Sequence, residues 1–217
     1  MSAAPVEYFT PDDAPLTLLE EANKLLEHNP GYRVEIIGGV LTVTPPADVA
    51  HSRGLNKLVR PFVAAGLDDG PTEVHQAIGL WLPDGPEDYA VPDLSVVDAD
   101  IDDHLIENNC YDPAVFRMTL EVTSSNYQND LRNKVAAYAI AKVPVYVIVD
   151  RKHNRLHVLT DPIANEYDQH RIHAPGQLVT LPESIGAKVT LDVTEALTAS
   201  RHKRDPEPRS AEDTAAG

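Results

Sequence analysis

A strand–helix–strand segment in the second half of the chain most constrains its fold. Phe116 to Val122 and Val145 to Val149 are apolar runs of strand length, and Asp130 to Ala141 between them has the apolar spacing of a helix. Two strands joined through a helix pair in parallel, and such crossovers are almost always right-handed. The segment therefore predicts an α/β fold in which a helix packs on a sheet.

The rest of the chain predicts further helices and strands around this segment. Helical spacing of apolar residues is found at 16–26, 48–63 and 194–197. Strands are predicted at 32–37, 40–43, 73–82, 94–97, 156–159, 170–172, 178–181 and 188–191. Gly38-Gly39 predicts a two-residue hairpin turn, and the acidic stretch from Val97 to Tyr111 is expected to be a loop with one helical turn. Hairpins at both ends would make the central sheet mixed rather than purely parallel.

The length and composition match one soluble domain. The 217 residues are 42% hydrophobic and 24% charged, and the last of them are polar and contain proline. We therefore expect a single domain over residues 1–198 and a disordered tail over residues 199–217. No apolar run approaches the ~20 residues of a membrane span, and the start has no apolar signal segment. Cys110 is the single cysteine, which excludes an intramolecular disulfide and a multi-cysteine metal site, so a cytoplasmic protein is expected.

The net charge of −16 weighs against simple electrostatic binding of nucleic acid. Residues 1–110 hold 20 acidic against 5 basic side chains, whereas residues 111–217 hold 14 against 13. Binding to phosphates draws on clustered Lys and Arg, and the chain has no long basic patch. Most of the acidic excess is expected to serve solubility, while two or three carboxylates could hold a divalent cation.

Two acidic residues stand where predicted strands begin or end. Asp93 follows Pro92 and opens the apolar run 94–97, which places a carboxylate at a sheet end, although an Asp at such a position is more often a turn or cap residue. Glu121 stands near the end of the strand 116–122, where a buried carboxylate needs a partner. That partner is either a basic side chain or a metal ion.

Lys134 is the nearest candidate for that basic partner. Asp130, Lys134 and Tyr138 are four residues apart and share one face of the predicted helix. The same spacing also describes an ordinary Asp130–Lys134 pair on the solvent side, and spacing alone slightly favours this second interpretation.

Together these motifs resemble the Uma-two family of restriction endonuclease-like proteins, which is placed in the PD-(D/E)xK nuclease superfamily. The resemblance covers roughly residues 32–197. It rests on Pro92-Asp93, Glu121 to Ser125, the helix face of Asp130, Lys134 and Tyr138, Val143 to Asp150, the strand Tyr32 to Glu35 with its Gly-Gly turn, and the helix that carries His51. The family implies a restriction-endonuclease-like mixed central sheet flanked by helices, with additional antiparallel strands toward the C-terminus.

The resemblance also implies a divalent-metal site at one end of the sheet. Asp93, Glu121 and the backbone carbonyl of Val122 would bind the metal, and oxygen ligands of this kind suit Mg²⁺ or Mn²⁺. Thr123 stands where the superfamily usually carries its Lys, so Lys134 would be a migrated replacement with a catalytic role. Possible accessory residues are Glu35, His51, Asp130 and Tyr138. Taken alone, Glu35 could equally face solvent, and His51 would be a residue of the helix surface.

The expected function is that of a metal-dependent endonuclease that hydrolyses DNA phosphodiester bonds with a metal-activated water. DNA is the expected substrate, and the superfamily often forms homodimers. The alternative is a catalytically degenerate protein of the same fold that serves as a binding or assembly module. The acidic charge and the missing basic track motivate this alternative.

Overall fold

The computed structural model describes residues 16–123 and 132–199, which form two six-stranded sheets and a small two-stranded one. In spatial order the first sheet consists of β2 (Val40–Thr44), β1 (Arg33–Ile37), β5 (Tyr89–Ala90), β4 (Gly79–Trp81), β8 (Cys110–Tyr111) and β7 (Leu105–Glu107). The second sheet consists of β12 (Glu166–His173), β11 (Arg155–Ile163), β10 (Val145–Asp150), β9 (Phe116–Val122), β6 (Leu94–Asp98) and β3 (Thr72–His75). The small sheet pairs β13 (Leu178–Thr180) with β14 (Thr190–Asp192).

The predicted strand–helix–strand segment forms the centre of the second sheet. Strands β9 and β10 are parallel, with Val147 opposite Leu120, and α3 (Lys134–Ile140) lies between them in sequence. Every residue of β10 is buried, which explains the apolar run Val145 to Val149 that precedes the buried Asp150. Strand β6 runs antiparallel on the other side of β9, so the start of β6 lies at the same sheet end as the end of β9.

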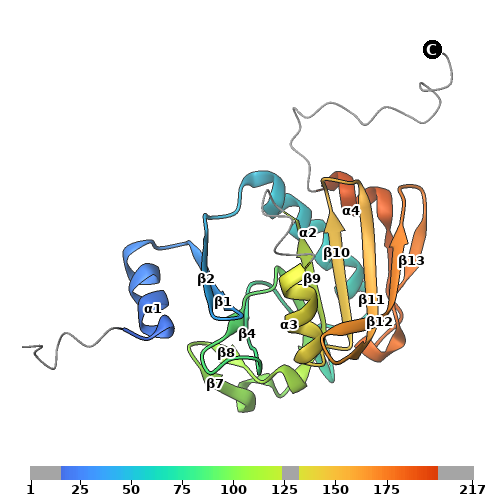
Figure 1. The fold of residues 1–217 in the computed structure, drawn as a ribbon. Coiled ribbons are helices and arrows are strands. Elements are labelled where there is room, and N and C mark those ends of the chain that lie inside the picture. The colour runs from blue at the N-terminus through green and yellow to red at the C-terminus, as the bar shows by residue number, and fades with distance from the viewer. Residues whose placement is uncertain (1–15, 124–131, 200–217) are drawn as a thin grey trace, which may run out of the picture.

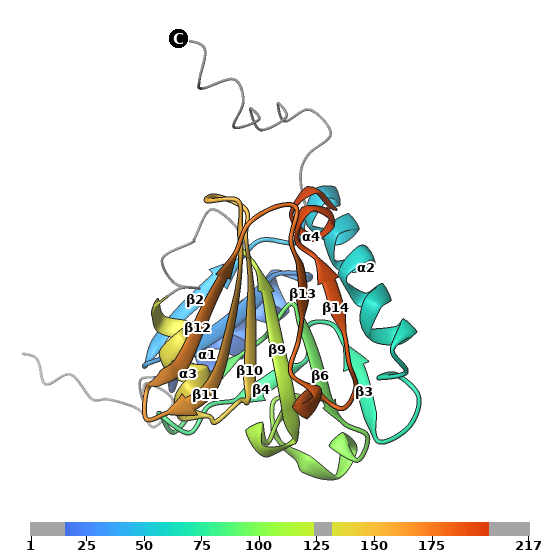
Figure 2. The ribbon, with the colours of Figure 1, turned by 90° about the vertical axis from the view of Figure 1, so that its right-hand side faces the viewer.

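Helices cover both faces of this sheet (Figures 1 and 2). Helix α3 packs on one face through Tyr138, which contacts Tyr146 of β10 edge to face at 4.9 Å between ring centroids. On the other face α2 (Val49–Ala64) and α4 (Val193–Ala199) share a core with Leu120 and Val147. A third apolar cluster joins α1 (Leu18–His28) to β1 through residues such as Ala22 and Ile36. Short 3₁₀ helices at η2 (Ile101–His104), η3 (Pro113–Val115) and η5 (Glu183–Ile185) complete the described elements.

Most of the predicted elements are confirmed, and local chemistry accounts for their ends. Helix α1 begins after Thr17, whose hydroxyl accepts a hydrogen bond from the Glu20 amide while the Glu20 carboxylate accepts one from the Thr17 amide. Helix α2 begins after Asp48, whose carboxylate accepts from the His51 amide. Gly38 and Gly39 form the β1–β2 turn at φ +60° and +69°, a conformation that glycine adopts at little cost.

Three predictions about the strands are wrong. The N-terminal hairpin does not join the central sheet, because β1 pairs with β5 in the other sheet. The run 73–82 is two strands in different sheets, separated by a turn in which Ala77 has φ +56°. The acidic stretch before Tyr111 holds the helical turn η2 but also the hairpin β7–β8, which alternation did not indicate.

Two further expectations concern the C-terminal tail and membrane-spanning helices. The predicted tail lies outside the described residues except for Ala199, which ends α4. Within 16–123 and 132–199, no helix is long and apolar enough to cross a membrane.

Candidate active site

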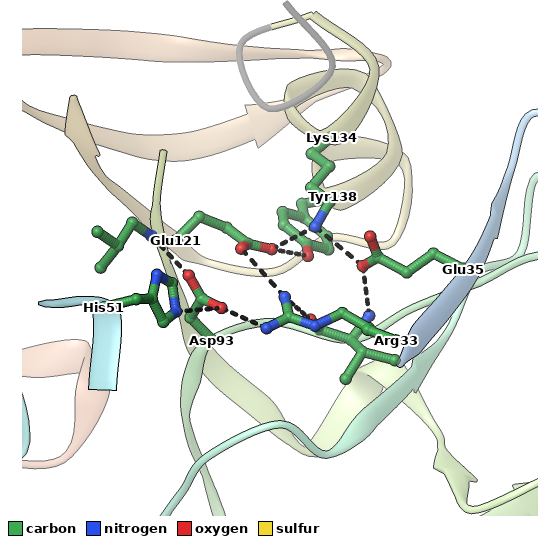
Figure 3. Close-up of polar contacts among 9 residues, drawn as sticks. Arg33, Glu35, His51, Asp93, Glu121, Lys134 and Tyr138 are labelled. Atoms are coloured by element: carbon green, nitrogen blue, oxygen red, sulfur yellow. Dashed lines mark hydrogen bonds and ion pairs between the residues drawn. The ribbon is translucent and has the colours of Figure 1, made fainter. Parts of the chain in front are cut away.

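Two acidic side chains, one from strand β9 and one from the residue before strand β6, converge at one end of the second sheet (Figure 3). Glu121 is the penultimate residue of β9, and Asp93 immediately precedes β6. Because β6 and β9 are antiparallel with Leu94 opposite Leu120, the two carboxylates meet at the same edge. Both are buried, with 2% of Asp93 and 3% of Glu121 exposed.

Asp93 is held ionised by groups from three elements. Its Oδ1 lies 2.6 Å from Nη2 of Arg33, and its Oδ2 accepts a hydrogen bond of 2.8 Å from the Val122 amide. Burial raises the pKa of Asp93, but His51, Arg33 and the Val122 amide outweigh burial and hold that pKa well below its usual range. Nε2 of His51 lies 3.2 Å from Oδ1 without an aligned hydrogen bond, so we regard Arg33 and the Val122 amide as the firmer partners.

Glu121 belongs to a buried network centred on the Lys134 ammonium. Nζ of Lys134 donates to Oε1 of Glu121 at 2.7 Å and to Oε1 of Glu35 at 2.9 Å. The hydroxyl of Tyr138, one helical turn further along α3, also donates to Oε1 of Glu121 at 3.0 Å. Burial and the neighbouring Glu121 raise the pKa of Tyr138 well above its ordinary value, so this hydroxyl stays protonated.

Strand β1 of the other sheet supplies the remaining side chains. Arg33 and Glu35 are two residues apart and therefore point to the same side of the strand. Arg33 donates to the Val91 carbonyl at 3.0 Å, and the Val91 amide donates to Oε1 of Glu35 at 2.7 Å. The segment that leads to Asp93 is thus hydrogen-bonded to side chains of β1 through both the carbonyl and the amide of Val91. Glu121 receives a second, longer ion pair from Nη1 of Arg33 at 3.9 Å.

Comparison with known proteins decides the family. A family model named Uma2 and described as "Putative restriction endonuclease" matches residues 19–194, which is most of the chain. The chain belongs to the Uma2 family. A search of the curated proteins found no match.

A solved structure supports the same fold for this Uma2 chain. The crystal structure of a protein from Anabaena variabilis, titled "a putative nuclease belonging to DUF820", superimposes with a TM-score of 0.63 at 17% identity. The alignment covers 86% of the present chain and all of the other. At this identity the likeness shows the fold, which is the α/β nuclease fold with helices on a mixed sheet that the sequence predicts.

The geometry brings together most of the residues that the sequence singled out. Lys134 is 3% exposed and faces the sheet, so the solvent-side interpretation of the helix face is wrong. Glu35 is buried at the same place, and His51, from the first turn of α2, faces Asp93 rather than the helix surface. Asp130 lies outside the described residues. Val122 contacts Asp93 through its amide, while metal binding by its carbonyl stays a prediction.

Arg33 is the site residue that the sequence analysis did not single out. Its signal was present, because an Arg two residues before Glu35 on a strand must share its face. What the sequence could not show is that this strand, from another sheet, passes over the end of β9.

The site fits a hard divalent cation through its donor chemistry. The carboxylate oxygens of Asp93 and Glu121 lie together at one end of the second sheet. Nε2 of His51 is buried beside them without a hydrogen-bond partner among the described residues. In residues 16–123 and 132–199 no three His, Cys, Asp or Glu side chains form a complete ligand cluster. Mg²⁺ commonly takes only one or two carboxylates and completes its shell with water and substrate phosphate, so two protein carboxylates suffice.

Proposed function

We propose that this Uma2 protein is a Mg²⁺- or Mn²⁺-dependent endonuclease that hydrolyses DNA phosphodiester bonds. The observation that carries the proposal is the convergence of Asp93, Glu121 and Lys134 at the end of β9 in a chain of this family. The two carboxylates would hold the cation, and Asp93 is ionised across the physiological pH range because its pKa is lowered. A bound cation supplies a water of lowered pKa and neutralises charge on the phosphate.

Lys134 and Arg33 would then act on the substrate side of this chemistry. The Lys134 ammonium, fixed between Glu35 and Glu121, is a preorganised positive charge in a water-poor setting, where it stabilises developing negative charge strongly. Arg33 has 23% of its side chain exposed and presents a planar guanidinium suited to phosphate oxygens. These two cations offset part of the negative charge of Glu35, Asp93 and Glu121, and the bound metal would supply the remainder.

A plasmid-nicking assay with purified protein in Mg²⁺ or Mn²⁺ tests the proposal. We expect Glu121→Gln and Asp93→Asn each to lower the cleavage rate by roughly a hundredfold or more, because several kcal/mol of transition-state stabilisation would be lost. Glu166→Gln is the matched control, since Glu166 is an exposed carboxylate on edge strand β12. Cleavage by the Asp93/Glu121 double variant at the unaltered rate would refute the assignment.

A second function is favoured by one specific observation. Both carboxylates already have cationic partners within the protein, Arg33 for Asp93 and Lys134 for Glu121. A catalytically degenerate member of the family, serving as a binding or assembly module, would retain such a site because its carboxylates are neutralised without a metal. Calorimetric titration with Mn²⁺ separates the two functions: saturable binding that Asp93→Asn removes supports the nuclease, whereas no binding at millimolar Mn²⁺ supports the module.

A further inference from the structure

A cleft of about 510 Å³ opens beside the site and is not explained by the metal chemistry. It lies between β1, the segment after β2 and the β7–β8 turn, and its volume falls in the range of small-ligand clefts, roughly 300–1,000 Å³. Arg33 and Val91 line it and also contact the carboxylate cluster. Whatever occupies the cleft is therefore adjacent to the proposed scissile phosphate.

The lining of the cleft is mostly uncharged. Among the described residues that line it, Arg33 is the only charged one, and its guanidinium is engaged by Asp93 and the Val91 carbonyl. Tyr32, with 38% of its surface exposed, lines the cleft together with Pro45 and Pro46. Such walls fit a planar, uncharged ring system and do not fit a second phosphate.

Hydrogen-bonding groups are also present at the cleft. Asn108 and Asn109 form the two-residue β7–β8 turn, with φ of +53° and +55°, and both line the cleft. The hydroxyl of Tyr89, another lining residue, is buried and has no hydrogen-bond partner within the described residues. A buried hydroxyl usually finds a partner, so this unsatisfied one, on a residue that lines the cleft, supports a polar ligand atom nearby.

We propose that this cleft binds one nucleobase of the DNA strand whose phosphate lies at the Asp93–Glu121 site. The base would stack on Tyr32 and offer its polar edge to the Asn108–Asn109 amides and the Tyr89 hydroxyl, as bases unstacked from a helix are held in other enzymes. This inference rests on the proposed function, because the base belongs to its substrate. It adds base recognition next to the bond that is cut.

The first test uses free nucleosides, so that base binding is measured without cleavage. The four deoxynucleosides are titrated into ¹⁵N-labelled protein, and the side-chain amide signals of Asn108 and Asn109 are followed by NMR. We expect saturable shifts with at least one nucleoside and none with deoxyribose 5-phosphate, which lacks the base. Equal shifts with both probes, or no shift with any nucleoside at millimolar concentration, would overturn the proposal.

Matched variants locate the binding to the cleft. Tyr32→Ala should weaken nucleoside binding roughly tenfold by removing the stacking face, whereas Tyr32→Phe should retain it. Asn109→Gly keeps the positive-φ turn while removing the amide, so a smaller loss is expected. Leu178→Ala, at an exposed position in a different cleft, should change nothing. Binding that survives Tyr32→Ala unchanged would place the base elsewhere and reject the cleft.

A second test distinguishes this inference from the proposed nuclease activity. Short DNA substrates carry a single abasic position that is moved along the strand, and cleavage is measured for each. We expect one abasic position to slow the wild type but not Tyr32→Ala, which already lacks the stacking face. If the wild type cleaves DNA but no abasic position slows it, the base cleft is rejected and the proposed nuclease activity is retained. Nucleoside binding without any cleavage supports base recognition and rejects hydrolysis.

Discussion

The two halves of the site neutralise their carboxylates in different ways. The inner half, defined as Glu35, Glu121, Lys134 and Tyr138, is almost wholly buried, and one ammonium bridges two carboxylates. The outer half, defined as Arg33, Asp93 and His51, is reached from outside, since Arg33 has 23% and His51 13% of its side chain exposed. The inner half depends on ion pairs that water cannot replace, while the outer half can exchange partners with a ligand.

This difference suggests a division of work within the site. The inner half holds its charges fixed whether or not substrate is present, which is the preorganisation that electrostatic stabilisation requires. The outer half contains the Asp93 carboxylate, the adjacent His51 nitrogen and the guanidinium that borders the proposed base cleft. Binding of cation and substrate is therefore expected to rearrange the outer half first.

The largest expected effect comes from removing the cation of the inner half. Lys134→Met leaves Glu35 and Glu121 buried without their shared partner, which should lower the free energy of unfolding by about 3–5 kcal/mol. Urea unfolding at neutral pH measures it, with Lys188→Met, at an exposed position, as the control. A loss below about 1 kcal/mol would show that Glu35 and Glu121 do not depend on the Lys134 ammonium.

A smaller loss of unfolding free energy is expected when the outer half loses the Arg33 guanidinium. Arg33→Met removes the ion pair to Asp93, but that carboxylate keeps the Val122 amide and the neighbouring His51. We expect the free energy of unfolding to fall by roughly 1.5–3 kcal/mol in the same urea experiment. Arg60→Met, on the exposed face of α2, is the control. The comparison between the halves fails if Arg33→Met is as costly as Lys134→Met.

Acid should destabilise the protein partly through the outer half. The pKa of Asp93 is lower in the folded chain than the value of about 3.9 in an unfolded one, so its contribution is complete above that value and is lost as pH falls through the folded pKa. Between pH 5 and pH 2 this one group should account for about 2 kcal/mol of the loss. The measurement is urea unfolding across this range for the wild type and Asp93→Asn. Parallel curves for the two proteins would show that Asp93 is not held ionised.

The smallest effect on stability is expected from removing the Tyr138 hydroxyl of the inner half. Tyr138→Phe removes the hydrogen bond to Glu121 but keeps the ring that packs on Tyr146. Because Lys134 still neutralises Glu121, we expect a loss of only about 1 kcal/mol in unfolding free energy. Thermal unfolding compares it with Tyr167→Phe, which removes a buried hydrogen bond to the Val143 carbonyl away from the site. A loss as large as that of Lys134→Met would make Tyr138 a principal partner of Glu121.

The sequence predicted the inner half better than the outer half for a physical reason. Glu121 and Lys134 belong to one continuous strand–helix–strand unit, whose parallel pairing and handedness restrict where the start of the helix can lie. Even there, the four-residue spacing of the helix face was compatible with a solvent-side pair until α3 was seen to pack on the sheet. The outer half joins β1, the start of α2 and the start of β6, which no local pattern relates.

The strand predictions that proved wrong failed for the same reason, because local patterns do not relate distant elements. Alternation within 32–43 and 73–82 indicated strands correctly, but strand propensity carries no information about which sheet a strand joins. The break at Ala77 depends on a positive φ that alanine seldom adopts, so nothing in its identity announced it. The hairpin β7–β8 is too short, at three and two residues, for a periodic signal.

By itself, the sequence determined the α/β class, the buried strands β9 and β10, the helix between them and the order of acidic and basic residues along that unit. These follow from periodicity and from the cost of burying an unpaired charge, which act locally. Tertiary structure alone decided that β1 of a second sheet crosses the end of β9 and brings Arg33 and Glu35 to Asp93, Glu121 and Lys134. The packing of one sheet against another depends on contacts between residues some 60 to 99 positions apart, which neighbouring residues do not encode.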